Sequence, residues 1–450
     1  MNQSAQTENI RQPLKNFQRS ANAPDIECEL MIIGLGISGM ASALFAANRG
    51  ISVVQTGMTG EIIFASGLID LMGVHPVQNK KTWDDPWAAI RAVSKNIPRH
   101  PYARMQQQTI QKALDEFTSF FGDAGFHYHG HENRNARLIT SAGTIKQTYL
   151  VPRTMWHGVA ALQEKAPCLI VDFHGLKDFS ACQIVSVLKK EWPDLQHLRI
   201  SIPGAGEKRN EVYSEHIARS LELPSNREKL SENIRPFLKN IKAIGMPPVL
   251  GMTRTDQARS HMEELLGVPV FEIPAMPPSV TGLRLREAFE EHFHGDGIQT
   301  LYQKKVLRSR SLEDGSFVFD VGTREKEVTV KAGGAILASG RFIGKGLSAD
   351  RKHIQETIFD LPVCQPENRT GWHDKEFFSK NGHEINKAGI EIDNDFRPVG
   401  TSGKPVFQNL FAAGSIVAHN DWKRMKCGSG VAIATAYGAV VSFHKHLRKK

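Results

Sequence analysis

Residues 30–57, "LMIIGLGISGMASALFAANRGISVVQTG", decide the fold. A hydrophobic run leads into Gly34-x-Gly36-x-x-Gly39, and an alanine-rich segment and a second hydrophobic run follow. In such a unit the first glycine makes a tight turn, the second lets the backbone approach a phosphate, and the third permits close helix–strand packing. The stretch therefore predicts a strand, a helix whose N-terminus faces an anion, and a second strand.

The second hydrophobic run ends with Gln55 and Thr56, where this unit usually carries Asp or Glu. A carboxylate at that position holds a ribose by a charge-assisted hydrogen bond, which an amide cannot match. One interpretation is that no adenosine half is bound and that the ligand is FMN, whose single phosphate needs only the glycine turn. The alternative is that Gln55 still contacts an adenosine ribose, less tightly. The pattern favours FMN and keeps FAD as the alternative.

The composition is that of an ordinary globular protein, and it excludes several classes. The 450 residues hold 56 basic and 47 acidic side chains, a net charge of +9, and no basic block interleaved with aromatics predicts a nucleic-acid groove. No apolar run approaches the roughly 20 residues of a membrane-spanning helix. The five cysteines form no C-x-x-C, so the spacing predicts neither an iron–sulfur cluster nor a zinc site, and a reduced cytoplasm fits best.

The chain is expected to consist of an α/β nucleotide domain interrupted by a second α/β domain. The predicted divisions are a disordered extension (1–27), the first part of the flavin-binding domain (28–160), an inserted substrate or cap domain (161–310), and the second part of the flavin-binding domain (311–450). Hydrophobic periodicity predicts strands at 167–173, 198–203, 247–252, 269–274 and 409–415, helices near 106–125, at 179–192 and from 428 to the C-terminus, and a strand pair at 326–340.

Glycine-containing segments elsewhere are further candidates for a cofactor site. Ser66 and Gly67 can bring backbone N–H groups to a flavin or phosphate, although a plain turn before a helix explains them equally well. "NLFAAGS" ends in Gly414 and Ser415, with Ser415 standing where flavoproteins commonly carry Asp. The helix after Cys427 can direct its N-terminus at reduced flavin, and Cys427 is expected to be a packed residue. The expected cofactor contacts are Gly34, Gly36, Ile37, Ser38, Gly39, Gln55, Thr56, Ser66, Gly67, Gly340, Gly414, Ser415, Gly428, Gly430 and Val431.

The segment "PAMPPSVTGLRLREAF", residues 274–289, is the most distinctive part of the middle of the chain. Arg284 and Arg286 could offer bidentate contacts to a substrate phosphate or carboxylate. The alternative is a loop that caps a helix with a solvated charged face. No catalytic base is evident, although His174 and His419 are placed for proton transfer.

Taken together, these motifs resemble those of the B-subunit of anaerobic glycerol-3-phosphate dehydrogenases. Besides the glycine turn, four blocks match: "FASGLIDLMG" (64–73), "MPPSVTGLRLRE" (276–287), "AILASGRFIGKGL" (335–347), and "NLFAAGSIV" (409–417) with "CGSGVAIATA" (427–436). The first two are much more specific than the glycine turn. Segment 418–426, "AHNDWKRMK", is basic where the family tends to be glycine-rich.

The resemblance implies a Rossmann-like FAD/NAD(P)-binding fold and an FMN-associated flavoprotein subunit. In that family it pairs with an FAD-containing A-subunit, and an iron–sulfur C-subunit holds the pair on the cytoplasmic face of the membrane. The complex oxidises sn-glycerol 3-phosphate to dihydroxyacetone phosphate and passes electrons to quinone. If this chain does the same, we expect Arg284 to hold the substrate phosphate, with Arg286 a weaker candidate. Two alternatives remain: a non-catalytic electron-relay or assembly role, and a stand-alone FAD oxidoreductase acting on another small acid.

Overall fold

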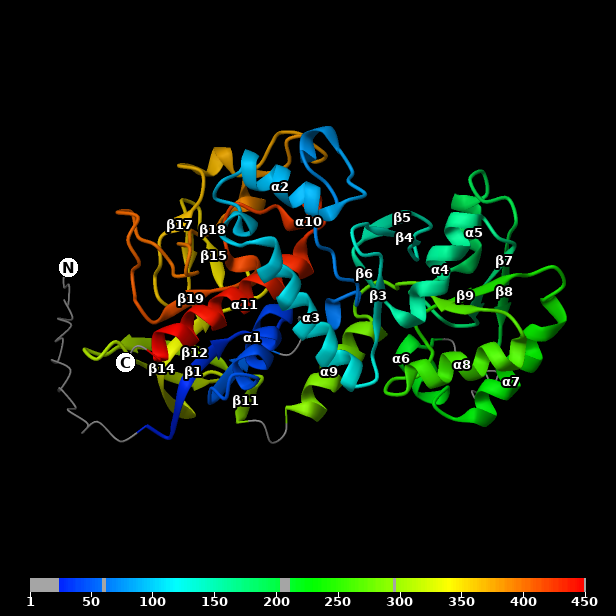
Figure 1. The fold of residues 1–450 in the computed structure, drawn as a ribbon, viewed down its shortest axis with the longest axis horizontal. Coiled ribbons are helices and arrows are strands. Elements are labelled where there is room, and N and C mark those ends of the chain that lie inside the picture. Colours follow the sequence, from blue (N-terminus) through cyan, green and yellow to red (C-terminus); the bar gives the residue numbers. More distant parts are fainter. Residues whose placement is uncertain (1–23, 59–61, 203–210, 294–296, 449–450) are drawn as a thin grey trace, which may run out of the picture.

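The structure is a computed structural model that describes residues 24–58, 62–202, 211–293 and 297–448. It forms two bodies side by side, each built around its own sheet (Figure 1). Of the predicted extension, residues 1–23 lie outside the described residues. Among the described helices, none is long and apolar enough to cross a membrane.

The first body contains a seven-stranded sheet in the order β11-β2-β1-β14-β13-β12, with β19 also paired to β14. Strands β11, β2, β1, β14 and β19 run parallel, and β12 and β13 add an antiparallel extension. The bounds are β1 Ile26–Ile33, β2 Val53–Gly57, β11 Ile298–Tyr302, β12 Lys305–Ser311, β13 Phe317–Gly322, β14 Val328–Leu337 and β19 Leu410–Ala412.

Helices α1 (Ile37–Ala47) and α11 (Gly428–Leu447) pack against each other beside this sheet. Both are rich in alanine and glycine, so their backbones can approach closely, and Phe45 meets Tyr437 edge to face. Helix α3 (Gln107–Asp123) packs on α11. The same body holds α2 (Pro86–Asn96), α9 (Val280–His292), α10 (Trp422–Met425) and the short pairs β15 (Leu347–Ala349) with β16 (Ile354–Glu356) and β17 (Val363–Cys364) with β18 (Gly389–Ile390).

The second body is a parallel four-stranded sheet in the order β10-β9-β7-β8 with its own buried core. Its strands are β7 (Cys168–Phe173), β8 (Leu195–Ile200), β9 (Ala243–Met246) and β10 (Val270–Glu272), and its helices are α4 (Arg153–Glu164), α5 (Ala181–Leu188), α6 (Ser214–Ser220), α7 (Pro224–Ile234) and α8 (Thr255–Leu266). Two antiparallel pairs accompany it, β3 (Tyr128–Gly130) with β6 (Leu150–Pro152) and β4 (Ala136–Ile139) with β5 (Ile145–Thr148).

Two predictions about strands were wrong. The strand expected at 247–252 lies earlier, as β9, because Pro247 and Pro248 cannot donate to a ladder. The segment 326–340 is not a strand pair but contains the single ten-residue strand β14, which runs through Gly333 and Gly334 without turning.

The sheet pairing also bears on where the inserted domain begins and ends. Helix α4 packs on β10, whereas α9 packs on the 62–64 turn and β11 pairs with β2 of the first sheet. We therefore propose that the insert begins before α4 and ends before α9, instead of spanning residues 161–310.

Candidate functional site

The glycine turn joins β1 to α1 and leaves no room for side chains at its first and third glycines. Gly34 has φ +135°, and a Cβ there would lie 2.2 Å from the Ala338 carbonyl oxygen. A Cβ on Gly39 would lie 2.0 Å from the Gly34 carbonyl oxygen. Gly36 is the N-cap of α1 and supplies no side-chain cap. The N–H groups of Ile37, Ser38 and Gly39 in the first turn therefore have no acceptor within the helix, which is the arrangement that binds a phosphate.

Two buried hydroxyls without a partner lie beside this turn. Ser38 Oγ and Ser339 Oγ are both buried and make no hydrogen bond in the structure. A Cβ on Gly414, which has φ +80°, would lie 2.7 Å from Ser38 Cβ. The backbone nitrogen of Ser339 would lie 3.3 Å from a Cβ on Gly34, and Ser339 Oγ would lie 2.3 Å from a Cβ on Gly346. The start of α1 and the ends of β14 and β19 thus converge at the carboxyl edge of the parallel strands, where α/β sheets bind ligands. Because a buried hydroxyl is costly to leave unpaired, these two fit a phosphorylated cofactor.

Gln55 and Thr56 are both fully buried, and the structure shows what each side chain does. Gln55 Nε2 donates to the Gly34 carbonyl at 2.9 Å and so braces the glycine turn, while Gln55 Oε1 is buried without a partner. Thr56 Oγ1 donates to the carbonyls of Leu301 and Lys304 and ties β2 to the β11 edge. One acceptor, Gln55 Oε1, therefore remains for a ligand hydroxyl, whereas the Thr56 hydroxyl is committed to the protein.

The predicted close approach at Gly67 is made by protein. Gly67 has φ +77°, and a Cβ there would lie 2.1 Å from the Thr281 methyl carbon at the start of α9. Ser66 Oγ accepts a 3.4 Å hydrogen bond from the Leu68 nitrogen. This turn packs against α9 within the first body, so the interpretation of Gly67 as a point of flavin approach is not supported by the geometry.

The N-terminus of α11 is likewise largely covered by the segment that follows this turn. The Gly430 nitrogen donates to the Asp70 carbonyl at 3.0 Å, and the Asp70 nitrogen donates to Ser429 Oγ at 2.7 Å. A Cβ on Gly430 would lie 2.5 Å from the Tyr102 hydroxyl, and Val431 is buried. Gly430 and Val431 are therefore packing positions here. Gly428 is also close-packed, because a Cβ there would lie 2.8 Å from the Trp422 ring.

Arg341 organises the turn after β19 and was missed by the sequence analysis. It follows Gly340, which has φ +70°, and its guanidinium donates to the carbonyls of Ser415, Asn386, Val417 and Asn420. Burial lowers the pKa of Arg341 to about 10. The one feature of the sequence that could have pointed to Arg341 is its position directly after the glycine in "ASGR".

The phosphate-binding role predicted for Arg284 is contradicted by its surroundings. Arg284 is 3 % exposed, and its guanidinium donates to Glu272 at 2.7 and 2.8 Å and to the Gly251 carbonyl at 2.7 and 2.9 Å. Glu272 also accepts from the Leu250 nitrogen at 2.8 Å. The pair joins α9 to β10, that is, the first body to the second.

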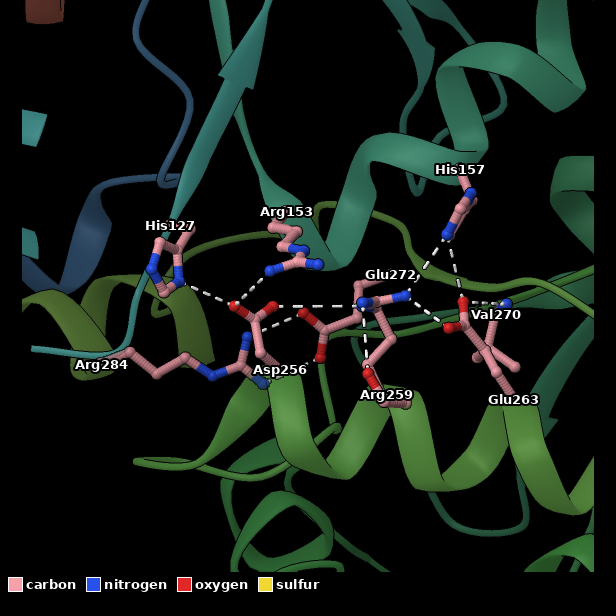
Figure 2. A network of polar contacts seen from close by, with 10 residues as sticks. His127, Arg153, His157, Asp256, Arg259, Glu263, Val270, Glu272 and Arg284 are labelled. Carbon is pink, nitrogen blue, oxygen red and sulfur yellow. Dashed lines mark hydrogen bonds and ion pairs between the residues drawn. The ribbon is translucent and has the colours of Figure 1, made fainter. Parts of the chain in front are cut away.

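Figure 2 shows this pair beside a second network centred on α8. Asp256 contacts His127 at 2.8 Å and Arg153 at 3.6 Å, and Arg259 pairs with Glu263. The contacts of Asp256 join α8 to Arg153 at the start of α4 and to His127, which directly precedes β3, whereas the Arg259–Glu263 pair lies within α8. Arg286 differs from Arg284, because its side chain is 30 % exposed and lies 3.4 Å from Glu290 in an ion pair within α9.

Comparisons with known proteins show the family of this chain. The family model described as "FAD binding domain" matches residues 29–431. The B-subunit of the anaerobic glycerol-3-phosphate dehydrogenase of Vibrio vulnificus (strain YJ016) is 30% identical over 423 residues, covering 92% of this chain and 95% of the relative. The probable B-subunit of Halobacterium salinarum (strain ATCC 29341 / DSM 671 / R1) is 28% identical over 430 residues, with 92% and 97% covered.

Among solved structures, the 3-ketosteroid delta1-dehydrogenase of Sterolibacterium denitrificans matches at 10% identity and a TM-score of 0.42, covering 93% of this chain and all of the other. The range matched by the family model begins within β1 and ends at the start of α11, so it contains the glycine turn and the convergent edge described above. The chain belongs to the FAD-binding domain family and, within it, to the B-subunit family of anaerobic glycerol-3-phosphate dehydrogenases.

Proposed function

We propose that this chain is the flavin-carrying subunit of an anaerobic glycerol-3-phosphate dehydrogenase. In this proposal it oxidises sn-glycerol 3-phosphate to dihydroxyacetone phosphate. Electrons leave through an FAD-containing A-subunit and an iron–sulfur C-subunit to quinone at the cytoplasmic face of the membrane. The observation that carries the proposal is the 30% identity to the B-subunit of Vibrio vulnificus across 92% of this chain. The glycine turn with its two unpartnered hydroxyls supports the flavin part independently.

The flavin we propose is FAD, the alternative of the sequence analysis, in preference to FMN. The sequence favoured FMN because Gln55 lacks a carboxylate. In the structure, however, the buried Oε1 atom of Gln55 has no partner, and it can accept a hydrogen bond from a ribose hydroxyl. The description of the family model supports the same choice. Mass identification of the flavin released on denaturation tests this directly: FAD supports the proposal, and FMN restores the original prediction.

A bound flavin would supply the hydride acceptor for oxidation of the substrate alcohol. The residues of this chain would bind and orient the flavin. The first-turn N–H groups of α1 and the Ser38 hydroxyl would face its phosphate. Arg341 would keep the turn at Gly414 and Ser415 in position by holding four carbonyls.

Ser38→Ala is expected to weaken flavin binding about tenfold without destabilising the flavin-free protein. The hydroxyl has no partner to lose in the structure, whereas a hydrogen bond to a charged phosphate contributes about 1.5 to 3 kcal/mol. Titration of the flavin-free variant with flavin, followed by fluorescence, gives the affinity. Ser42→Ala is the matched control, because Ser42 Oγ already donates to the Ser38 carbonyl at 2.8 Å. Equal affinities in the two variants would remove Ser38 from the site.

A second candidate function, electron relay without substrate chemistry, is favoured by one observation. The arginine expected to hold the substrate phosphate, Arg284, has its guanidinium committed to Glu272 and Gly251. Anaerobic addition of sn-glycerol 3-phosphate to the purified, flavin-loaded chain separates the two functions. Bleaching of the flavin absorbance supports catalysis on this chain. Unchanged absorbance, with bleaching only after the A-subunit of a relative is added, supports a relay.

Arg286 remains our proposed contact for the substrate phosphate. If it makes this contact, Arg286→Ala raises the KM for sn-glycerol 3-phosphate about tenfold or more with little change in kcat, because a charge-assisted hydrogen bond is lost. The control is Arg324→Ala, which removes an exposed arginine in the loop between β13 and β14. An unchanged KM would show that Arg286 does not contact the substrate phosphate and only pairs with Glu290.

A further inference from the structure

Three segments far apart in the sequence bring a thiol, a carboxylate and an imidazole together in the first body. Cys364 ends β17, Glu391 follows β18, and His419 follows the turn after β19. The antiparallel pairing places Cys364 opposite Gly389, and the Ala418 nitrogen donates to the Ile390 carbonyl at 2.9 Å. The backbone itself therefore fixes the cluster.

The three side chains are close enough to share one ligand. One sulfur, one carboxylate oxygen and one ring nitrogen all lie within 4.8 Å of one another, and each residue is half-buried. The His419 ring contacts the Glu391 carboxylate directly. His419 has φ +64°, a conformation rarely adopted by residues other than glycine, and its nitrogen donates to the Lys387 carbonyl at 3.0 Å. The backbone thus holds this ring over the other two side chains.

One side of the cluster is open. Cys364 and Glu391 line a cavity of about 510 Å³ that is also lined by Arg99, Arg104 and the 399–403 loop. A ligand held by the three side chains would therefore be reachable by small molecules from this cavity.

We propose that Cys364, Glu391 and His419 form a binding site for a divalent cation of the zinc class, with the fourth coordination position facing the cavity. Thiolate, imidazole and carboxylate are the ligand types that Zn²⁺ takes, and three protein ligands with one open position are typical of sites that bind an exogenous ligand. Sequence spacing could not predict this site, because no two of its members lie within 20 residues of each other.

Two arginines next to the site limit what can occupy the open position. Arg104 Nη2 lies 3.4 Å from Glu391 Oε1, and Arg99 Nη1 lies 4.0 Å from Oε2. Arg104 fixes the carboxylate in place, as groups behind metal ligands commonly do. Their positive charge opposes the cation but favours an anion as the fourth ligand, so the site would take a small carboxylate or phosphate from the cavity.

Titration of the full chain with Co²⁺ and Zn²⁺ tests the proposal. We expect one Co²⁺ per chain, with a sulfur-to-cobalt charge-transfer band in the difference spectrum that Zn²⁺ abolishes. Cys364→Ser should remove this band and weaken Zn²⁺ binding at least about tenfold, and His419→Gln should weaken it similarly. Cys182→Ser, at an exposed cysteine on α5, should leave both unchanged. A band that is absent from the unaltered protein, or that survives in Cys364→Ser, overturns the proposal.

A surface variant provides a test that does not depend on the cluster's own residues. Arg99 is largely exposed, and removing its charge in Arg99→Gln should tighten Zn²⁺ binding about two- to fivefold, as expected for a partly screened charge. Weaker or unchanged binding contradicts a cation beside Glu391. These measurements do not depend on bound flavin, so the metal proposal and the flavoprotein proposal stand or fall separately.

Discussion

Gly39→Ala is expected to abolish flavin retention and to destabilise the first body by about 3 kcal/mol or more. The added Cβ would lie 2.0 Å from the Gly34 carbonyl oxygen, 2.7 Å from its carbon and 3.2 Å from Gln55 Nε2. The two closest atoms belong to the backbone, so relief requires the turn to move away from α1. That movement would displace the first-turn N–H groups that we expect to face the phosphate. Urea unfolding and the flavin-to-protein ratio after purification measure both effects.

Gly50→Ala is the matched control for this variant. Gly50 lies just beyond α1 and has φ +67°, but a Cβ there would meet nothing within 4 Å. Its substitution should cost only about 1 kcal/mol, from the left-handed backbone conformation, and should leave flavin bound. If both variants lose flavin equally, general destabilisation explains the loss and the steric argument for the turn fails.

The part of the fold nearest the glycine turn could be predicted because its signals are local. The strand, turn, helix and second strand of residues 30–57 appear in the structure as β1, α1 and β2, and the final helix appears as α11. Each depends on hydrophobic periodicity and on glycines within one segment. The division into two bodies followed from the repeated α/β pattern. The domain boundaries stay predictions, because the pairing of β11 with β2 joins segments 245 residues apart, which periodicity within one segment cannot indicate.

The candidate site was predicted less completely, because burial and partners are set by the tertiary structure. Thr56 and Arg284 look like ligand contacts in the sequence, yet the fold directs both inward to protein acceptors. Gln55 was noticed as a departure, but its brace to the Gly34 carbonyl could not be foreseen. Arg341 has four carbonyl partners, all on segments at least 45 residues away, and so gave almost no sequence signal.

Arg284→Met is expected to destabilise the protein by about 3 to 5 kcal/mol, because it leaves the Glu272 carboxylate buried without its cation. The two side chains are 1% and 0% exposed, so water cannot replace the lost partner. Glu272→Leu should be similarly costly, since the guanidinium then loses both carboxylate contacts and the Leu250 nitrogen loses its acceptor. The stability of each variant is measured by urea unfolding of the flavin-loaded protein.

The double variant Arg284→Met/Glu272→Leu distinguishes a structural ion pair from a substrate contact. Removing both charges leaves no isolated ion, so the double variant should be at least about 2 kcal/mol more stable than the sum of the single effects predicts. Arg286→Met, at a half-buried arginine of the same helix whose ion pair with Glu290 lies within α9, should change stability by only about 1 kcal/mol and serves as the control. Two results together would contradict this expectation: the losses in stability are additive, and a folded Arg284→Met protein has a raised KM for sn-glycerol 3-phosphate. They would indicate that Arg284 contacts the substrate. The four hydrogen bonds from its guanidinium to Glu272 and Gly251 lead us to expect the non-additive outcome.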